Sequence, residues 1–382
     1  MKKKYLILLI LIILASIISC NKKNSGSDNT DQAAVITNEK PTNPIVTLKF
    51  CEELCLSEQG WWPANMLVDD GGNIYVFGEV ENSVHKYNAE GELLLKKVFP
   101  KGQGPGDFMF MDPYFSYEGR IFIYDKQQHR ISILDQNCEL IESYKTEGAK
   151  YLLRMDSKDN MYFWVGKSSL DKSTHVLTKF SSAGKKIHEI FEYVTPRPEF
   201  VEDKSMFIWP LYYRSAIYKL DSHDNVYYSL ITEYRINKLS PDGRLLKTIV
   251  KKGQTRKVTE RDIEEVSPQV EERQDIRTVF LPPENVPCIA DFFILENDYL
   301  LVITHENDYE EDTLAGDLFD DNGVYLNQID VPKYYLWNID TYSATIKKKA
   351  LCKENYFYII TCDESEENFY VKRFKISIFN LN

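Results

Sequence analysis

The sequence predicts an all-β fold, a six-bladed β-propeller of four-stranded antiparallel blades, because one strand-rich unit occurs repeatedly along the chain. Each copy has an apolar strand, a turn of Asp, Asn or Gly, a strand similar to Ile-Tyr-Val, and a third strand followed by a Gly-containing turn. In three copies the second and third strands are 12 residues apart: Tyr75 to Tyr87, Phe122 to Leu134 and Tyr227 to Leu239. Repeats of roughly 40–50 residues built from short strands are typical of propellers, whose blades stack around an axis and protect one another's edges.

The copies follow one another in order, four clear ones and then two weaker ones. Their central turns and strands are 69–76, 118–125, 156–163, 221–228, 296–302 and 353–360. We therefore expect blades at 61–99, 108–146, 150–192, 212–250, 288–330 and 336–380, an insertion at 251–287, and closure of the ring by a strand at 45–56. An open β-sandwich is the alternative, but it does not predict the shared 12-residue register.

The N-terminus precedes this fold and predicts export. Three lysines at positions 2–4 are followed by an apolar stretch from Tyr5 to Ile18. This stretch is shorter than the roughly 20 residues of a membrane span, so we expect a signal peptide at 1–19. The end of the stretch, Ile17-Ile18-Ser19-Cys20, resembles a bacterial lipobox, which implies cleavage before Cys20 and lipidation of that residue. An ordinary signal peptide followed by a free cysteine is the alternative.

Residues 21–44 are rich in Lys, Ser, Asn, Asp and Thr and have few large apolar side chains. Little apolar surface offsets the entropy of ordering, so we expect a flexible tether from Cys20 to Pro44. The lipid would anchor the protein to a membrane of the cell envelope. The expected membrane is the outer one, because residue 21 is Asn rather than the Asp linked to inner-membrane retention in some bacteria.

The charge balance argues against nucleic-acid binding. The chain has 46 Lys and Arg against 58 Asp and Glu, a net charge of −12. An acidic surface is repelled by phosphate backbones, and no basic stripe is present in the sequence. We expect a monomer.

Six cysteines follow Cys20, in a compartment that permits disulfides. Their spacing is not that of a metal site, and six cysteines allow 15 pairings. Closure of the ring could bring together the two in the first strand and the two in the last blade, whereas free buried thiols are the simpler alternative. The six are Cys51, Cys55, Cys138, Cys288, Cys352 and Cys362.

A glycine-rich element lies between the first two blades, at Gly102-Gln103-Gly104-Pro105-Gly106-Asp107-Phe108. It resembles the Gly-x-Gly-Pro-Gly-Glu-Phe element of the six-bladed β-propeller lipoproteins, relatives of the NHL-repeat propellers, with Asp107 in place of the usual Glu. The segment 124–131 resembles the short NHL hairpin. The resemblance covers roughly residues 45–380 and implies a fold and an envelope location, but no activity. We do not expect phosphate binding here, because a P-loop needs Gly-Lys-Ser/Thr opening a helix.

Length variation predicts the binding face. The second-to-third strand loops lengthen at 166–174, 305–317 and 363–368, and the longest crossing is 251–288. All of these fall on one face of a propeller, where repeat scaffolds usually bind partners. Aromatic residues also precede the axial strands on that face, and we expect them to contact a ligand; the alternative is that each ring only packs between blades. They are Trp61, Trp62, Tyr114, Trp209, Tyr212 and Trp337.

Binding is favoured over catalysis. The six histidines share no repeated axial position, and the sequence has no HExxH and no paired-Cys motif. We expect an envelope-anchored binding protein whose partner is a protein, a peptide or a glycan, with no cofactor. The alternative is a metal-dependent propeller enzyme, a lactonase-like hydrolase or a lyase, at the axial mouth. The acidic run 306–312 could hold Ca²⁺, although a solvated loop fits its spacing better.

Overall fold

The computed structural model describes residues 33–379 apart from 43, 57–62, 79–80, 116–118, 147–149, 169–171, 197–198, 201–205, 211–215, 231, 253–255, 262–276, 282–283, 309–312, 333–349 and 363–367. Ala34–Asn382 form one compact unit. The expected signal peptide at 1–19 and the expected lipidation site Cys20 lie outside the described residues. The described residues contain no helix that is long and apolar enough to cross a membrane.

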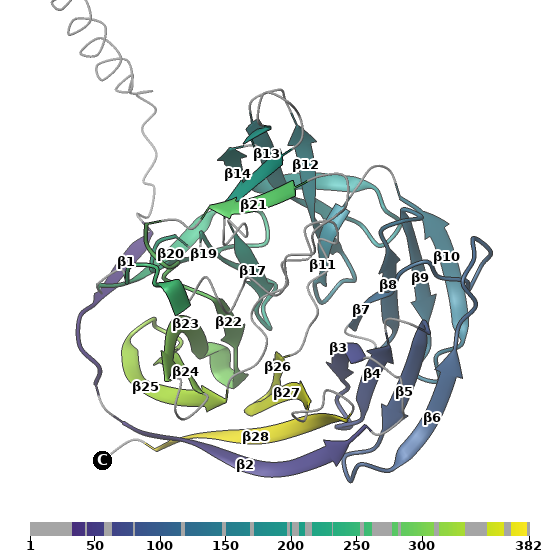
Figure 1. Ribbon diagram of the computed structural model, residues 1–382, viewed down its shortest axis with the longest axis horizontal. Helices are drawn as coiled ribbons and strands as arrows, with labels where there is room; N and C mark the ends of the chain where they lie inside the picture. Colours follow the sequence, from purple (N-terminus) through teal and green to yellow (C-terminus); the bar gives the residue numbers. More distant parts are fainter. Residues whose placement is uncertain are drawn as a thin grey trace, which may run out of the picture. The chain divides into compact units, whose positions relative to one another are not determined.

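Six antiparallel sheets surround a central axis, as the sequence predicted (Figure 1). Blade 1 is β3 (Pro63–Val68), β4 (Ile74–Gly78), β5 (Ser83–Tyr87) and β6 (Leu93–Val98); blade 2 is β7 (Asp112–Phe115), β8 (Ile121–Asp125), β9 (Arg130–Leu134) and β10 (Leu140–Lys145). Blade 3 is β11 (Lys150–Met155), β12 (Met161–Ser168), β13 (Lys172–Phe180) and β14 (Lys186–Pro196); blade 4 is β17 (Ile217–Leu220), β18 (Val226–Ser229), β19 (Arg235–Leu239) and β20 (Leu245–Lys251). Blade 5 is β22 (Asp291–Ile294), β23 (Leu300–Asp308), β24 (Thr313–Phe319) and β25 (Tyr325–Pro332); blade 6 is β26 (Ala350–Lys353), β27 (Tyr356–Cys362), β28 (Phe369–Phe379) and β2 (Ile45–Cys55).

The first strand of each blade is the innermost one. Each inner strand contacts those of the two neighbouring blades, in the order β3, β7, β11, β17, β22, β26 and back to β3. The apolar core lies between the blades rather than along the axis; Tyr75 and Phe77 of blade 1, for example, pack with Ile121 and Ile123 of blade 2. The side chains of the six inner strands therefore supply the lining of the axis.

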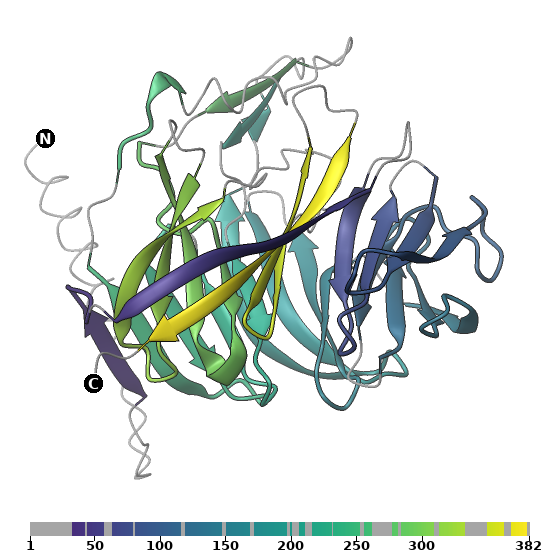
Figure 2. The ribbon, with the colours of Figure 1, turned by 90° about the horizontal axis from the view of Figure 1, so that it is seen from below.

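The ring is closed by the N-terminal part of the chain. The strand expected at 45–56 is β2, which pairs antiparallel with β28 as the outer strand of blade 6 (Figure 2). Cys55 of β2 pairs with Tyr370 and Cys362 of β27 pairs with Phe369, so β28 separates the two cysteines. Two strand spacings are about 10 Å, too far for a disulfide, and all six cysteines after Cys20 are free.

One segment of the expected tether is ordered on the propeller. Strand β1 (Ala34–Asn38) pairs in parallel with the outer strand β20 of blade 4. The side chain of Asn38 donates to the carbonyl oxygen of Gly323 at 2.9 Å and accepts from the backbone N–H of Tyr325 at 2.9 Å, both on blade 5. Composition did not reveal this strand because an added edge strand needs backbone partners more than apolar side chains. We call β1 and the residues up to Pro44 the N-terminal strap.

The glycine-rich crossing between blades 1 and 2 is organised by side chains of blade 2. Arg130 donates from Nη1 to the carbonyl oxygens of Gln103 and Gly104, at 2.9 and 2.7 Å, and from Nη2 to that of Asp107. The carboxylate of Asp107 accepts from the N–H of Gly104 at 3.0 Å, and a β-carbon at Gly104 would lie 2.8 Å from it. The glycines therefore allow a close crossing, and the loop presents carbonyl oxygens to a cation rather than N–H groups to a phosphate.

A small three-stranded sheet lies outside the blades. It consists of β15 (Glu199–Phe200), β16 (Met206–Pro210) and β21 (Arg277–Leu281) from the insertion, with β16 and β21 parallel. Figure 2 shows it on one face of the ring, the face where β28 begins. That face carries the loops between second and third strands, so the insertion and these loops share one side of the propeller.

Candidate binding site at the propeller axis

Of the six aromatic residues predicted to form a binding mouth, the structure describes only one side chain. Trp61, Trp62, Tyr212 and Trp337 lie outside the described residues, and of Trp209 only the backbone, in β16, is described. The aromatic mouth stays a prediction. The described residue is Tyr114, which is 5 % exposed on the inner strand β7.

Tyr114 belongs to a polar cluster on the inner strands that sequence motifs did not indicate. Its hydroxyl donates to Oδ2 of Asp112 at 2.9 Å, and its ring centroid lies 5.3 Å from the guanidinium carbon of Arg154 on β11. The same guanidinium lies 5.7 Å from the ring of Tyr218 on β17. Arg154 is thus held beside aromatic rings of both neighbouring blades.

A second charged pair continues the cluster into blade 5. Nζ of Lys219, on β17, lies 3.2 Å from Oδ1 of Asp291, on β22, and each of the two side chains is 20 % exposed. Lys219 also lies 4.9 Å from the ring of Phe293, while Oδ1 of Asp291 accepts the N–H of Phe292 at 2.8 Å. Solvent therefore reaches this pair, whereas Tyr114 is buried.

Four consecutive blades each contribute one charged side chain to this axial cluster. Their order around the axis, from blade 2 to blade 5, is negative, positive, positive, negative: Asp112, Arg154, Lys219, Asp291. The two cations are neighbours and the two carboxylates flank them. We refer to these four residues with Tyr114 and Tyr218 as the axial cluster.

The pKa directions show how closely these groups interact. Burial lowers the pKa of Lys219, and the charge of Arg154 lowers it further against the opposing effect of Asp291. Burial by itself would lower the pKa of Arg154, but Tyr114, Tyr218, Asp112 and Asp291 outweigh it and raise that pKa. Burial raises the pKa of both tyrosines above their ordinary value, so they remain neutral phenols.

A thiol near this cluster is not activated. Burial raises the pKa of Cys352, on the inner strand β26 of blade 6, well above its ordinary value, despite the opposing charge of Lys219. The thiolate is the nucleophilic form of cysteine. Cys352 therefore lacks the character of a catalytic nucleophile.

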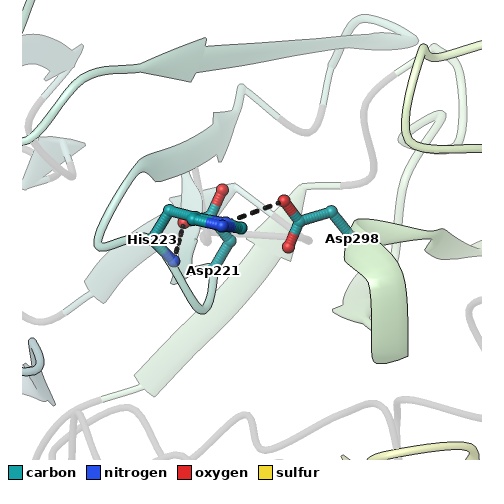
Figure 3. Close-up of side chains that lie close together, drawn as sticks. All are labelled: Asp221, His223 and Asp298. Carbon is teal, nitrogen blue, oxygen red and sulfur yellow. Dashed lines mark hydrogen bonds and ion pairs between the residues drawn. The ribbon is translucent and has the colours of Figure 1, made fainter.

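A different group, Asp221, His223 and Asp298, has donor atoms that all lie within 4.8 Å of one another, as a metal site would require (Figure 3). Asp221 and His223 belong to the turn between β17 and β18, and Asp298 to the corresponding segment of blade 5, the 3-10 turn η2 (Glu296–Asp298). His223 Nδ1 lies 3.3 Å from Asp298 Oδ2, and the His223 side chain is 74 % exposed.

A lysine already supplies the cation in this group. Asp221 Oδ2 lies 2.9 Å from Nζ of Lys238, which also approaches Asp298 Oδ2 at 3.6 Å. The other oxygen of Asp221 accepts the backbone N–H groups of His223 and Asn225, at 2.9 and 2.8 Å. The carboxylate is therefore fully engaged within the protein.

The same arrangement recurs in blade 3, which identifies it as part of the propeller repeat. Asp156 accepts the N–H of Asn160 at 2.8 Å and pairs with Nζ of Lys179 at 2.8 Å. In both blades the lysine pairs with a tyrosine on the preceding strand, and its Nζ lies over the tyrosine ring. Nζ of Lys179 is 5.0 Å from the ring centroid of Tyr162, and Nζ of Lys238 is 4.8 Å from that of Tyr227.

The contact of His223 with Asp298 also has a counterpart between blades 3 and 4. Ser157 donates from N and Oγ to the carboxylate of Asp224, at 2.7 and 2.6 Å, just as Ser222 approaches Asp298 at 3.5 Å. Asp224 and Asp298 both have positive φ, 65° and 59°, and both carboxylates contact residues of the preceding blade. The residues of Figure 3 therefore fit an inter-blade fastening that recurs in the propeller.

Comparison with known proteins places the fold. A family model described as 6-bladed beta-propeller matches residues 64–316. A solved structure named as an exported protein from Bacteroides fragilis has a TM-score of 0.54 and 12 % identity, covering 91 % of this chain and 100 % of that one. A member of the duf4221 family from Bacteroides vulgatus has a TM-score of 0.53 and 12 % identity, covering 88 % of this chain and 99 % of that one.

A virginiamycin B lyase from Staphylococcus aureus is also similar, at 10 % identity over 86 % of this chain and 99 % of that one, but its TM-score of 0.43 is too low to bear on function. No curated protein matches the chain.

Proposed function

The chain belongs to this family of six-bladed β-propellers, and we propose that it is a binding protein of the cell envelope, anchored through a lipid on Cys20, whose ligand or partner docks at the axial cluster. The proposed ligand approaches from the loop-rich face. Trp61, Trp62, Trp209, Tyr212 and Trp337 are proposed to surround it there.

One observation carries the proposal: charged side chains from four consecutive blades meet on the inner strands. Removing charges from water costs free energy even when they are paired, and well-packed apolar residues often serve stability equally well. The cores between blades of this propeller are packed by residues such as Tyr75, Phe77, Ile121 and Ile123, and charged pairs such as Lys251 and Asp317 join blades 4 and 5 away from the axis. Four charged side chains gathered from different blades at a partly exposed axis indicate a site for a ligand.

The two faces of the propeller support the direction of approach. On the face of the turns between first and second strands, Arg120 pairs with Asp159, Asn355 with Glu296 and Lys353 with Asp70, in addition to the two fastenings described above. These bonds join neighbouring blades. The opposite face carries the small sheet and the connections between second and third strands; the segments 166–174 and 305–317, predicted to be long loops, are mostly continued strand there.

A binding role suits the chemistry of the axial cluster better than catalysis. It consists of two cations, two carboxylates and two phenols kept neutral by burial. Its thiol neighbour Cys352 is protonated. These groups donate and accept hydrogen bonds, which orients a ligand.

The test is a thermal-shift screen of the full chain with cell-wall fragments, glycans and short peptides. A ligand that binds only the folded state raises the melting temperature. We expect a shift that is lost in Arg154→Met and retained in Lys97→Met, a matched control whose lysine pairs with Glu139 on the outer part of blades 1 and 2. A screen without any shift, or a shift equal in Arg154→Met and wild type, would overturn the proposal.

A further inference from the structure

Two cations stand next to each other at the centre of the axial cluster. Arg154 and Lys219 lie on β11 and β17, inner strands of neighbouring blades that contact each other, while Asp112 and Asp291 lie on the strands to either side. We propose that the axis binds an anionic group, a carboxylate or a phosphate, between Arg154 and Lys219. This inference rests on the proposed function and names the chemical class of its ligand.

The order of charges is the first argument. Like charges on adjacent strands repel each other, and the repulsion is strongest where solvent is partly excluded. The carboxylates are placed on the outer sides of the pair, so neither lies between the two cations in the order of strands. An anion in the middle would relieve this repulsion. Burial is the main cause of the lowered pKa of Lys219, and the charge of Arg154 acts in the same direction.

The hydrogen-bond donors of the two cations are the second argument. Lys219 has three N–H donors, and Asp291 is one partner, at 3.2 Å. The ring centroids of Tyr114 and Tyr218 lie 5.3 and 5.7 Å from the guanidinium carbon of Arg154, so the guanidinium is held beside both rings. A guanidinium fixed in this way presents donors in one plane, which matches the two oxygens of a carboxylate or phosphate.

Access and charge define the ligand further. The side chains of Lys219 and Asp291 are each 20 % exposed, so a ligand reaches the pair from solvent. The four charged residues sum to zero, with two cations and two carboxylates. A group with a single negative charge disturbs this balance least, so we expect a carboxylate to bind more tightly than a dianionic phosphate.

The experiment measures binding to the full chain at constant ionic strength by calorimetry and thermal shift. The probes are sodium acetate, N-acetylalanine, inorganic phosphate and, as an uncharged compound, glucose. We expect N-acetylalanine to bind, at least tenfold weaker binding in Arg154→Gln and in Lys219→Gln, and unchanged binding in Lys97→Gln. The Asp291→Asn variant is expected to bind several-fold more tightly, because it releases Lys219 and removes a negative charge; a merely structural role of Asp291 would not give tighter binding.

The outcomes separate this inference from the proposed function. Phosphate binding with the same dependence on Arg154 and Lys219, and stronger than that of both carboxylates, would support the anion site and identify phosphate as its ligand. Anions without effect, or bound equally by both Gln variants, would overturn the inference. If only a neutral glycan or peptide then shows Arg154-dependent binding, the proposed function stands and the anionic class is wrong. Near-ultraviolet circular dichroism checks the fold of each variant, and Lys219→Gln decides the case if Arg154→Gln does not fold.

Discussion

Arg130 donates a hydrogen bond from its guanidinium Nη1 to the backbone carbonyl oxygen of Gly104, at 2.7 Å. This bond joins the segment 124–131, which resembles the short NHL hairpin, to the glycine-rich crossing that precedes it, two features that the sequence showed separately. Arg130 is only 6 % exposed, so its side chain acts as an internal support for the crossing between blades 1 and 2.

Replacing Arg130 should therefore destabilise the propeller. In Arg130→Met the carbonyl oxygens of Gln103, Gly104 and Asp107 lose their donor, and we expect a loss of about 3 kcal/mol in the free energy of unfolding. Urea unfolding measures it. The exposed neighbour Lys101 provides the control, because Lys101→Met should change stability by less than about 0.5 kcal/mol. A similar small change in both variants would show that the crossing does not depend on Arg130.

The ion pair of Asp156 and Lys179 should make stability depend on pH in the acid range. Burial alone would raise the pKa of Asp156, but hydrogen bonds from Lys179 and Asn160 outweigh it and lower that pKa below its ordinary value of 3.8. A lowered carboxyl pKa means that the pair contributes fully above the unfolded-state pKa and loses its contribution as the pH falls through the folded-state value.

We expect Asp156→Asn to lower the free energy of unfolding by about 3 kcal/mol at pH 7, because it leaves the buried Lys179 without its carboxylate. This difference from wild type should close below pH 3.8, where the wild-type carboxylate also becomes protonated. Urea unfolding from pH 7 down to pH 3 measures this. In the control Asp70→Asn, the carboxylate is 84 % exposed, and we expect little change at any pH. A gap that stays constant into the acid range would contradict the role of the charge.

The group at Asp221, His223 and Asp298 should behave as a fastening and not as a metal site. Neither Zn²⁺ nor a chelator should shift the melting temperature of the wild type. His223→Ala should lower the free energy of unfolding by less than about 1 kcal/mol, because the contact of His223 with Asp298 is exposed. Lys238→Met should lower it by about 3 kcal/mol, because the buried Asp221 loses its cation. A zinc-dependent rise in the wild type that disappears in His223→Ala would show that a metal binds there after all.

The N-terminal strap should contribute to the stability of blades 4 and 5. Asn38 is 7 % exposed and bridges β20 and blade 5, so Asn38→Ala should cost about 2 kcal/mol. Hydrogen exchange should show protected amides in β1 and faster exchange there in the variant. The matched control is Glu39→Ala, whose exposed pair with Lys252 should not matter. Amides of β1 that exchange as fast as an unfolded chain in the wild type would contradict the pairing with β20.

The sequence predicted the architecture because that information is local and repeated. Asp-x-x-x-Asn-x-Tyr at 69–75, 156–162 and 221–227 encodes a turn that one carboxylate closes, followed by a strand, and a fixed step leads to the next strand. The matching family model and the observed blades confirm the six-bladed fold. The strand at 45–56 was expected to close the ring because propellers often pair a terminal strand with the opposite end of the chain, and β2 does pair with β28.

The candidate site was decided by the tertiary structure alone. Asp112, Arg154, Lys219 and Asp291 share no motif, and each lies in a short strand with several apolar residues. Only the closure of the ring brings the inner strands of blades 2 to 5 together. The same holds for β1, whose partner β20 lies about 200 residues away. The alternation of apolar and polar residues within a strand is set by the strand's own sequence. Contacts at the axis and at the outer edges depend instead on how whole blades stack, because the two residues of such a contact belong to different parts of the chain.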